Sequence, residues 1–262
     1  MRGILDVQRQ FHIKTLPEEV GKYVILAGDP GRIPSIAEYL TDARQIAYNR
    51  EFNVYSGYLD GELVTACSTG IGGPSAAIAV EELMECGADT FIRVGTSGGI
   101  AEKVRSGDLV IASAAVRAEG TSREYLPAVY PAAADFDVTT ALARAAEELS
   151  EDKTGRRFHV GVVQSKDSFY GQVKPEASPV SYELKERWES YKKLGCLCSE
   201  MECASIFSVG LARGARCGAV MLAIWNLETA YAGVDETVDH DTSRAVRCAV
   251  EAVRKLIAGD KA

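Results

Sequence analysis

Two arginines stand where this sequence could hold an anion. Arg32 ends the segment GDPGR (28–32), and Arg93 lies inside the otherwise apolar segment FIRVG (91–95). Burying a guanidinium in an apolar strand is costly unless an anion or a carboxylate pairs with it. Because its planar fork matches phosphate and carboxylate oxygens, Arg93 is predicted either to form a structural ion pair or to clamp a bound anion. Thr96 adds a hydroxyl donor directly after this segment.

Glycine-rich segments follow three of the apolar runs, at 28–32, 69–75 (TGIGGPS) and 95–99 (GTSGG). Glycine lets backbone N–H groups approach an oxyanion closely, although each segment alone is also explained by a tight turn. The chain contains neither G-x-G-x-x-G nor G-x-x-x-x-G-K-[ST], which disfavours binding of a dinucleotide or a nucleoside triphosphate.

Two carboxylates, Glu200 and Glu202, stand at the start of a predicted helix with Met201 between them. They could simply favour the helix N-terminus electrostatically. They could also accept hydrogen bonds from the vicinal hydroxyls of a sugar. Both interpretations stay open at this point.

The sequence gives little support to covalent or metal-dependent catalysis. Its three histidines, His12, His159 and His240, are far apart in sequence and form no clear base–nucleophile pair. Cys196 and Cys198 are the closest of seven cysteines, and no further zinc ligands stand at matching spacing. We expect reduced, buried thiols that pack as apolar groups.

Alternating apolar runs and helical patterns position these residues. The sequence predicts strands at 23–27, 63–68, 91–95, 109–116, 159–164 and 218–225, helices at 75–86, 138–149, 201–213 and 242–257, and a surface loop at 173–181. This order predicts an α/β fold with a central, mostly parallel sheet flanked by helices. Residues 1–262 are expected to form one domain, and ligands to bind beyond the carboxyl ends of the strands.

Composition narrows the possible partners. The chain has 262 residues, 47% hydrophobic, and a formal net charge of −8. This acidic balance argues against binding nucleic acid or an anionic membrane. It does not exclude one small anion held locally by arginines. The first residues, MRGILDVQRQF, show no secretory signal pattern, and no apolar run reaches transmembrane length, so a cytoplasmic protein is expected.

Several motifs in the same order resemble the nucleoside phosphorylase superfamily, most closely its uridine branch. They are GDPGR (28–32), NREF (49–52), STGIGGPS and IAVEEL (68–75 and 78–83), RVGTSGG (93–99), QSKDSFYGQ (164–172) and EMECAS (200–205). The similarity runs from about Phe11 to the C-terminal helix. Motifs in register over nearly the whole chain are more specific than any single glycine segment.

This resemblance implies a pentosyltransferase, which carries out reversible phosphorolysis of uridine to uracil and ribose 1-phosphate, with deoxyuridine and thymidine also open as substrates. It implies a central mixed sheet flanked by helices, inorganic phosphate as co-substrate, no required cofactor, and a dimer-based homohexamer. Some relatives bind a potassium ion between subunits, and the equivalent positions are Glu51, Ile71 and Ser75.

The resemblance also assigns roles to individual residues. Arg93, Glu202 and His12 would be catalytic. Phosphate would be bound by Gly28, Arg32, Arg93 and Thr96, with Arg50 from a neighbouring subunit; ribose by Ser97, Met201 and Glu202, bordered by Glu200, with His12 from across the dimer; and the base by Phe169, Gln172 and Lys174.

Three departures from the pattern concern the base. Lys174 and Leu227 stand where the uridine branch usually has arginines, and the proline between Tyr170 and Gly171 is missing. Asn226 stands at or near the position of the acid that protonates the leaving base in purine branches, and an amide cannot act as a general acid. A phosphorylase for another nucleoside and a non-catalytic nucleoside-binding protein remain the alternatives.

Overall fold

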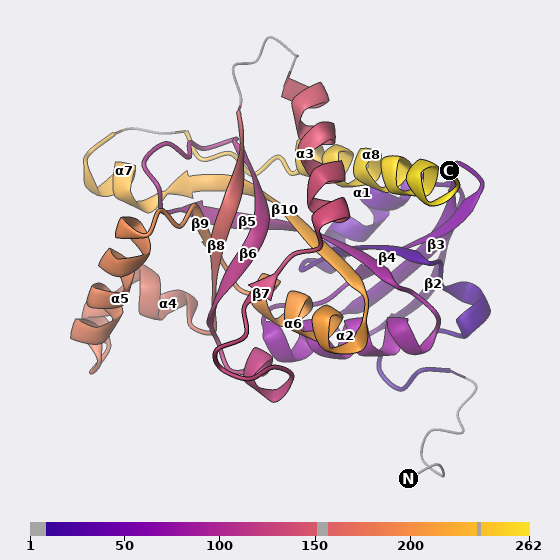
Figure 1. Cartoon of the computed structure of the whole chain (residues 1–262), viewed down its shortest axis with the longest axis horizontal. Coiled ribbons are helices and arrows are strands. Elements are labelled where there is room, and N and C mark those ends of the chain that lie inside the picture. The colour runs from indigo at the N-terminus through magenta and orange to yellow at the C-terminus, as the bar shows by residue number, and fades with distance from the viewer. Residues whose placement is uncertain (1–8, 151–156, 235–236) are drawn as a thin grey trace.

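The computed structural model describes residues 9–150, 157–234 and 237–262, so the start of the chain, on which the expected absence of a secretory signal depends, lies largely outside it. Its strands (Figure 1) are β1 (Tyr23–Ala27), β2 (Thr41–Asn49), β3 (Phe52–Leu59), β4 (Glu62–Ser68), β5 (Thr90–Gly99), β6 (Leu109–Ala118), β7 (Ala132–Ala133), β8 (Phe158–Lys166), β9 (Cys198–Glu200) and β10 (Arg216–Asn226).

The helices alternate with these strands. They are α1 (Ile33–Ala37), α2 (Gly73–Glu85), α3 (Phe136–Ser150), α4 (Phe169–Val173), α5 (Ser181–Lys193), α6 (Cys203–Arg213), α7 (Leu227–Tyr231) and α8 (Ser243–Asp260), with short 3₁₀ turns η2 (Pro17–Glu19), η3 (Pro30–Arg32), η4 (Thr121–Glu124) and η5 (Pro175–Ala177). No helix among the described residues is both long and apolar enough to span a bilayer.

All ten strands belong to one mixed sheet. β1 pairs in parallel with β4 and β5, and further parallel pairs join β5 to β10, β6 to β8 and β8 to β9. Because β5 pairs with both β9 and β10, the strands β10, β6, β8, β9 and β5 close into a barrel. The antiparallel strands β3 and β2 extend the sheet beyond β4. The predicted α/β fold with a mixed sheet is confirmed.

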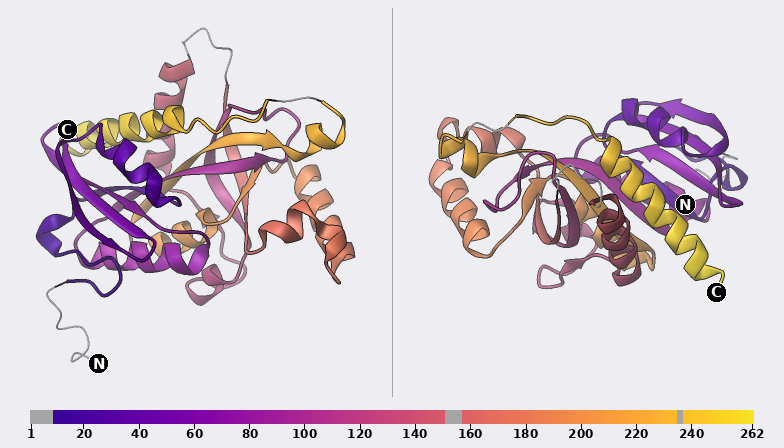
Figure 2. Two further views of the ribbon diagram at one scale, coloured as in Figure 1. Left: turned by 180° about the vertical axis from the view of Figure 1, so that it is seen from behind. Right: turned by 90° about the horizontal axis from the view of Figure 1, so that it is seen from above.

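Helices cover both faces of this sheet (Figures 1 and 2). Residues of α2 and α6 pack into one apolar core, and residues of α1, α3 and α8 pack into a second core on the opposite face. Successive residues of β5 supply the two cores in turn, with Phe91 in the first and Ile92 in the second. Arg93 follows in this alternation, so its side chain leaves the sheet on the same face as Phe91.

The structure corrects several predicted boundaries. The glycine segment 95–99 is not a loop but the second half of β5, and the helix predicted at 201–213 begins at Cys203. Within 173–181, the expected surface loop contains η5 and ends where α5 begins. The sequence did not reveal β2, β3 or α5. The strand β2 is largely exposed and carries no apolar alternation. The helix α5 does repeat Leu184, Trp188 and Tyr191 at helical spacing, although none of its residues is buried.

Candidate active site

A cavity of about 640 Å³ opens at the carboxyl ends of the strands. We call it the strand-end cavity. Its wall includes Gly28 after β1, Gly70 after β4, Ser97 near the end of β5, Lys166 at the end of β8 and Ser199 in β9. The predicted position of the ligand site, beyond the carboxyl ends of the strands, is therefore where the structure has a cavity.

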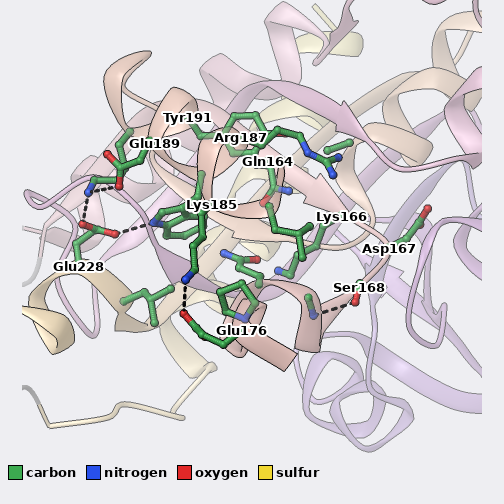
Figure 3. A pocket seen from close by; sticks show the side chains of 18 residues that line it. Gln164, Lys166, Asp167, Ser168, Glu176, Lys185, Arg187, Glu189, Tyr191 and Glu228 are labelled. Atoms are coloured by element: carbon green, nitrogen blue, oxygen red, sulfur yellow. Dashed lines mark hydrogen bonds and ion pairs between the residues drawn. The ribbon is translucent and has the colours of Figure 1, made fainter. Parts of the chain in front are cut away.

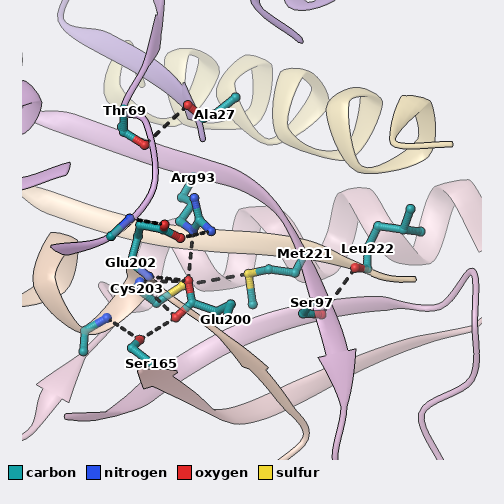
Figure 4. A network of polar contacts seen from close by, with 12 residues as sticks. Ala27, Thr69, Arg93, Ser97, Ser165, Glu200, Glu202, Cys203, Met221 and Leu222 are labelled. Carbon is teal, nitrogen blue, oxygen red and sulfur yellow. Dashed lines mark hydrogen bonds and ion pairs between the residues drawn. The ribbon is translucent and has the colours of Figure 1, made fainter. Parts of the chain in front are cut away.

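Arg93 is held in the wall of this cavity by two carboxylates (Figure 4). Its Nε donates to Glu200 at 3.1 Å, and its Nη2 forms a short contact with Glu202. The side chain is 4% exposed. Burial by itself would lower the pKa of Arg93, but Glu202 and Glu200 raise it above the ordinary value, so the guanidinium stays charged. The predicted alternative of a structural ion pair is thus realised.

The third nitrogen of this guanidinium, Nη1, contacts neither carboxylate. Nη1 of Arg93 is buried and has no hydrogen-bond partner among the residues that the structure describes. A Cβ on Gly28 would lie 3.3 Å from the carbonyl oxygen of Gly70 and 4.0 Å from this Nη1. Since Gly28 has no Cβ, the space beside Nη1 stays open. A buried donor without a partner is costly, and a bound anion would satisfy it.

Gly95 makes room for the same guanidinium. A Cβ at this position would lie 2.9 Å from Nη2 and 3.0 Å from Cζ of Arg93. The guanidinium cannot shift aside because Glu200 and Glu202 hold it. The glycine therefore serves the close approach of a side chain within β5 rather than a turn after it.

Arg32 is a second cation on the cavity wall. Its guanidinium has no ion pair with any residue in the described part of the chain. Burial, followed by the nearby charge of Arg93, lowers the pKa of Arg32. Two arginines that repel each other across a cavity, one unpaired and one with a spare donor, favour an anion between them. Thr96 also lines the cavity.

Glu200 and Glu202 differ in role. Glu200 accepts hydrogen bonds from the backbone N–H groups of Glu202 and Cys203, at the start of α6, and also contacts the Ser165 hydroxyl. It therefore stabilises the helix N-terminus, as one of the two interpretations predicted. Glu202 accepts from the backbone of Gly72 at 2.6 Å and lines the cavity together with Met201.

The other end of the cavity is aromatic and amide-bearing. Phe169 and Gln172, both from the short helix α4, line it together with Leu227. The Ser199 hydroxyl lies 2.7 Å from Oε1 of Gln172 and accepts a hydrogen bond from Lys166 at 2.7 Å. A flat ring with polar edges could stack on Phe169 and bond to Gln172 at this end.

Comparison with known proteins agrees with this geometry. The profile of the phosphorylase superfamily matches residues 22–258. The chain belongs to the phosphorylase superfamily. A uridine phosphorylase from Treponema pallidum is 45% identical over 260 residues, covering 99% of both chains. A uridine phosphorylase from Escherichia coli is 39% identical over 89% of this chain and 91% of its own. A guanosine phosphorylase from Halorubrum lacusprofundi is 37% identical over 95% of this chain and 99% of its own.

Most residues that the resemblance to this superfamily nominated lie around one cavity. Those that line it are Gly28, Arg32, Glu51, Ile71, Arg93, Thr96, Ser97, Phe169, Gln172, Met201 and Glu202, with Glu200 beside them. The superfamily motifs are therefore brought together by the strand ends, although they are up to about 170 residues apart in the chain.

Four nominated residues do not line this cavity. One of them, Ser75, donates to the Glu51 carboxylate at 2.6 Å. Arg50 is exposed in the turn between β2 and β3, with a positive φ of 53°. Nδ1 of His12 contacts Glu82 at 2.6 Å, and the backbone N–H groups of His12 and Ile13 donate to the same carboxylate. Lys174 caps the end of α4. It does not line the strand-end cavity, nor the second cavity described next.

A second cavity of about 580 Å³ adjoins the first (Figure 3). We call it the helical cavity, because α4, η5, α5 and the start of α7 enclose it. It shares Lys166, Gln172 and Leu227 with the strand-end cavity. Trp188 donates to Glu228 at 2.6 Å across it. The strand-end cavity therefore continues, beside Gln172 and Leu227, into a chamber that the helices form.

Sequence reasoning missed Lys166, although it lies inside the quoted motif QSKDSFYGQ. The signal that could have found it is a cation directly at the end of an apolar strand, the same signal that singled out Arg93. The seven cysteines are buried and unpaired, as expected, and burial raises the pKa of Cys196 to about 12. No cluster of three or more metal-ligating side chains occurs among the described residues.

Proposed function

We propose that this superfamily member is a uridine phosphorylase, which transfers the ribosyl group of uridine to phosphate and releases uracil. The observation that carries the proposal is the layout of the strand-end cavity. Arg32 and the unpartnered Nη1 of Arg93, which would hold an anion, line the same cavity as Phe169 and Gln172, which would hold a flat ring. The names of the relatives from Treponema pallidum and Escherichia coli support the same activity.

The reaction would proceed by direct displacement. An oxygen of hydrogen phosphate bonds to C1′ of the ribose, the bond from C1′ to N1 of the base breaks, and its electron pair leaves with the base. The sugar passes through an oxocarbenium-like state, for which phosphate is both nucleophile and counter-charge. The proton carried by hydrogen phosphate ends on the base, so the products are ribose 1-phosphate and uracil.

The residues of the cavity would have different roles in this reaction. Arg93 and Arg32 hold phosphate against C1′, which removes much of the entropic cost of bringing two reactants together. Glu202 would accept a hydrogen bond from a ribose hydroxyl, with Met201 and Ser97 alongside. Phe169 and Gln172 would fix the uracil ring. Glu200 acts through Arg93, which it orients from the end of β9.

Arg50 and His12 would act in the site of a neighbouring subunit, since neither lines the cavity of its own chain. We therefore propose a dimer-based oligomer, a hexamer by resemblance. For potassium, Glu51 and Ser75 offer hard oxygen donors that already lie 2.6 Å apart, and Ile71 would add a backbone carbonyl. This donor set fits an ion shared between two subunits, where it would join the interface rather than take part in the chemistry.

A guanosine phosphorylase is the second candidate, because one relative carries that name at 37% identity. The structure offers no acid for a purine at Asn226. Its amide accepts from the backbone of Glu228 and donates to the carbonyl oxygens of Ala101 and Val104, each at 2.8–2.9 Å. The side chain is thus committed to holding the loop before β6 and the start of α7.

The deciding experiment measures uracil release from uridine with and without phosphate, beside thymidine, deoxyuridine, inosine and guanosine. Phosphate-dependent release from uridine, at the highest kcat/KM of the panel, is expected. Release that ignores phosphate, or a preference for guanosine or inosine, would overturn the proposal. Nucleoside binding without turnover at any phosphate concentration would instead identify a non-catalytic binding protein.

A further inference from the structure

One lysine faces the base end of the cavity without a carboxylate partner. Lys166 ends β8 and lines both the strand-end and the helical cavity. Its Nζ donates to the Ser199 hydroxyl at 2.7 Å and lies 5.9 Å from the ring centroid of Phe169. Within the described residues, no carboxylate lies at ion-pair distance from it. The ammonium has three N–H donors, so two remain for another partner.

The other lysines around the helical cavity are differently placed. Lys185 pairs with Glu176 at 2.9 Å, and Lys192 pairs with Glu228 at 2.5 Å. Their charges are neutralised locally at the outer wall. Lys166 is instead close to the residues proposed to hold the base, since its Nζ lies 5.9 Å from the centre of the Phe169 ring and donates to the hydroxyl that contacts Gln172.

A row of hydrogen bonds ties Lys166 to the proposed base contact. The Ser199 hydroxyl that accepts from Lys166 lies 2.7 Å from Oε1 of Gln172 and 2.5 Å from Oε1 of Gln164. Its single proton can serve only one of these amides at a time, which leaves the Gln172 amide able to turn toward a ligand. Lys166, Ser199 and Gln172 therefore form one polar edge of the cavity.

Apart from Lys166, Arg32 and Arg93, no described residue that lines the strand-end cavity is a cation. Leu227, at a position where the resemblance expected an arginine, is an apolar part of both cavity walls, and Lys174 lines neither. Arg32 and Arg93 lie with the proposed phosphate site. Lys166, at the end of β8, thus supplies a cation in place of the arginine that is missing at Leu227.

We propose that Lys166 is a catalytic residue that stabilises the negative charge developing on the pyrimidine ring as its bond to ribose breaks. The inference rests on the proposed function, because a pyrimidine leaves with the electron pair of the glycosidic bond. That charge spreads from N1 over the ring carbonyl oxygens, which accept hydrogen bonds. Lys166 keeps its proton and acts as a fixed positive donor, while the proton for the base still comes from hydrogen phosphate.

Burial gives this amine an unusual environment. It lowers the pKa of Lys166 to about 8, while Glu200, Cys198 and Glu202 act in the opposite direction. The group is therefore mainly charged at neutral pH despite its partial burial. A desolvated charge acts more strongly on a nearby substrate than one in water.

The test compares two leaving groups. Lys166→Met should lower kcat for uridine about a hundredfold, the usual effect of removing one donor to a developing charge. With 5-fluorouridine, whose base is more acidic and needs less stabilisation, the loss should shrink to about tenfold. Lys166→Arg should recover part of the activity. Lys174→Met is the matched control, and it should leave the ratio of the two substrates unchanged.

Each other outcome counts against a specific claim. If Lys166→Met lowers kcat equally for both substrates, or if its kcat stays within about twofold of the wild-type value, the lysine is a structural partner of Ser199 and the catalytic role is wrong. Thermal denaturation of Lys166→Met and Lys166→Arg separates loss of folding from loss of chemistry. If the wild-type enzyme itself releases no uracil from uridine, the proposed function fails, and the role on a pyrimidine fails with it.

Discussion

Nε of Arg93, in β5, donates to Oε2 of Glu200, in β9, over 3.1 Å, and both side chains are almost fully buried. This pair joins two barrel strands that meet through only two residue pairs. It also fixes the guanidinium so that Nη1 is the one nitrogen without a protein partner in the described structure. The ion pair and the anion clamp are therefore compatible, because different nitrogens of one side chain would serve them.

Arg93→Lys tests this double role. A lysine keeps the charge but cannot reach two carboxylates and an anion at once. We expect the KM for phosphate to rise more than about tenfold, while uracil binding by calorimetry stays within about twofold. Arg93→Ala should also unfold more easily, because breaking a buried pair costs about 3–5 kcal/mol. An equal loss of phosphate and uracil binding would mean that Arg93 is purely structural.

Arg32→Ala separates phosphate binding from stability. Arg32 has no ion pair within the described residues, so its removal breaks no buried network. A lost charge-assisted hydrogen bond of about 1.5–3 kcal/mol predicts a KM for phosphate about tenfold to a hundredfold higher. The melting temperature should stay close to that of wild type. A large drop in melting temperature, or an unchanged KM for phosphate, would contradict this role.

The pH dependence of kcat/KM for uridine tests the charge on Lys166. Because its pKa is lowered to about 8, the ammonium is present below this pH and lost above it. Activity should therefore fall as pH rises through about 8. The charges of Glu200, Cys198 and Glu202 oppose this shift of the pKa of Lys166. Lys166→Arg should move the alkaline fall upward, since guanidinium keeps its proton; an identical profile for both proteins would refute the assignment.

Asn226→Asp should not create a purine phosphorylase. A carboxylate cannot donate to the carbonyl oxygens of Ala101 and Val104, which the Asn226 amide now satisfies. Leaving these buried groups unpaired costs about 1–3 kcal/mol, so the melting temperature should fall. Turnover of inosine and guanosine should not rise. A gain in purine turnover at unchanged stability would show that position 226 faces the base.

The proposed subunit-crossing role of His12 predicts an effect of Glu82, which holds Nδ1 of His12 at 2.6 Å. Glu82→Gln should reduce kcat/KM for uridine less than His12→Ala does, and the two losses should not add in the double variant. Light scattering on the same samples gives the oligomeric state. A fully active monomer would contradict the roles of both His12 and Arg50.

The amino-acid pattern was enough to identify the family and most of the buried elements, although it did not reveal the buried strand β3. Continuous apolar runs such as 23–27 and 109–116 are strands because only a strand buried on both faces needs such a run. The long amphipathic helix near the C-terminus followed from three-and-four spacing. The strand β2 was missed because its side chains are largely exposed to water and its sequence carries no alternation. The helix α5 was missed although Leu184, Trp188 and Tyr191 recur at helical spacing, and these side chains line a cavity rather than a core.

Tertiary structure decided what the site residues do. Sequence could not choose between an ion pair and an anion clamp for Arg93, because the choice depends on Glu200 and Glu202, more than 100 residues away. Nor could it rank Lys166 above Lys174, which stand only eight positions apart. In the structure Lys166 ends the barrel strand β8 and lines both cavities, whereas Lys174 caps α4 and lines neither. The chemistry of the site depends on which strand ends lie next to one another. The pairing of strands that are distant in the sequence determines this arrangement.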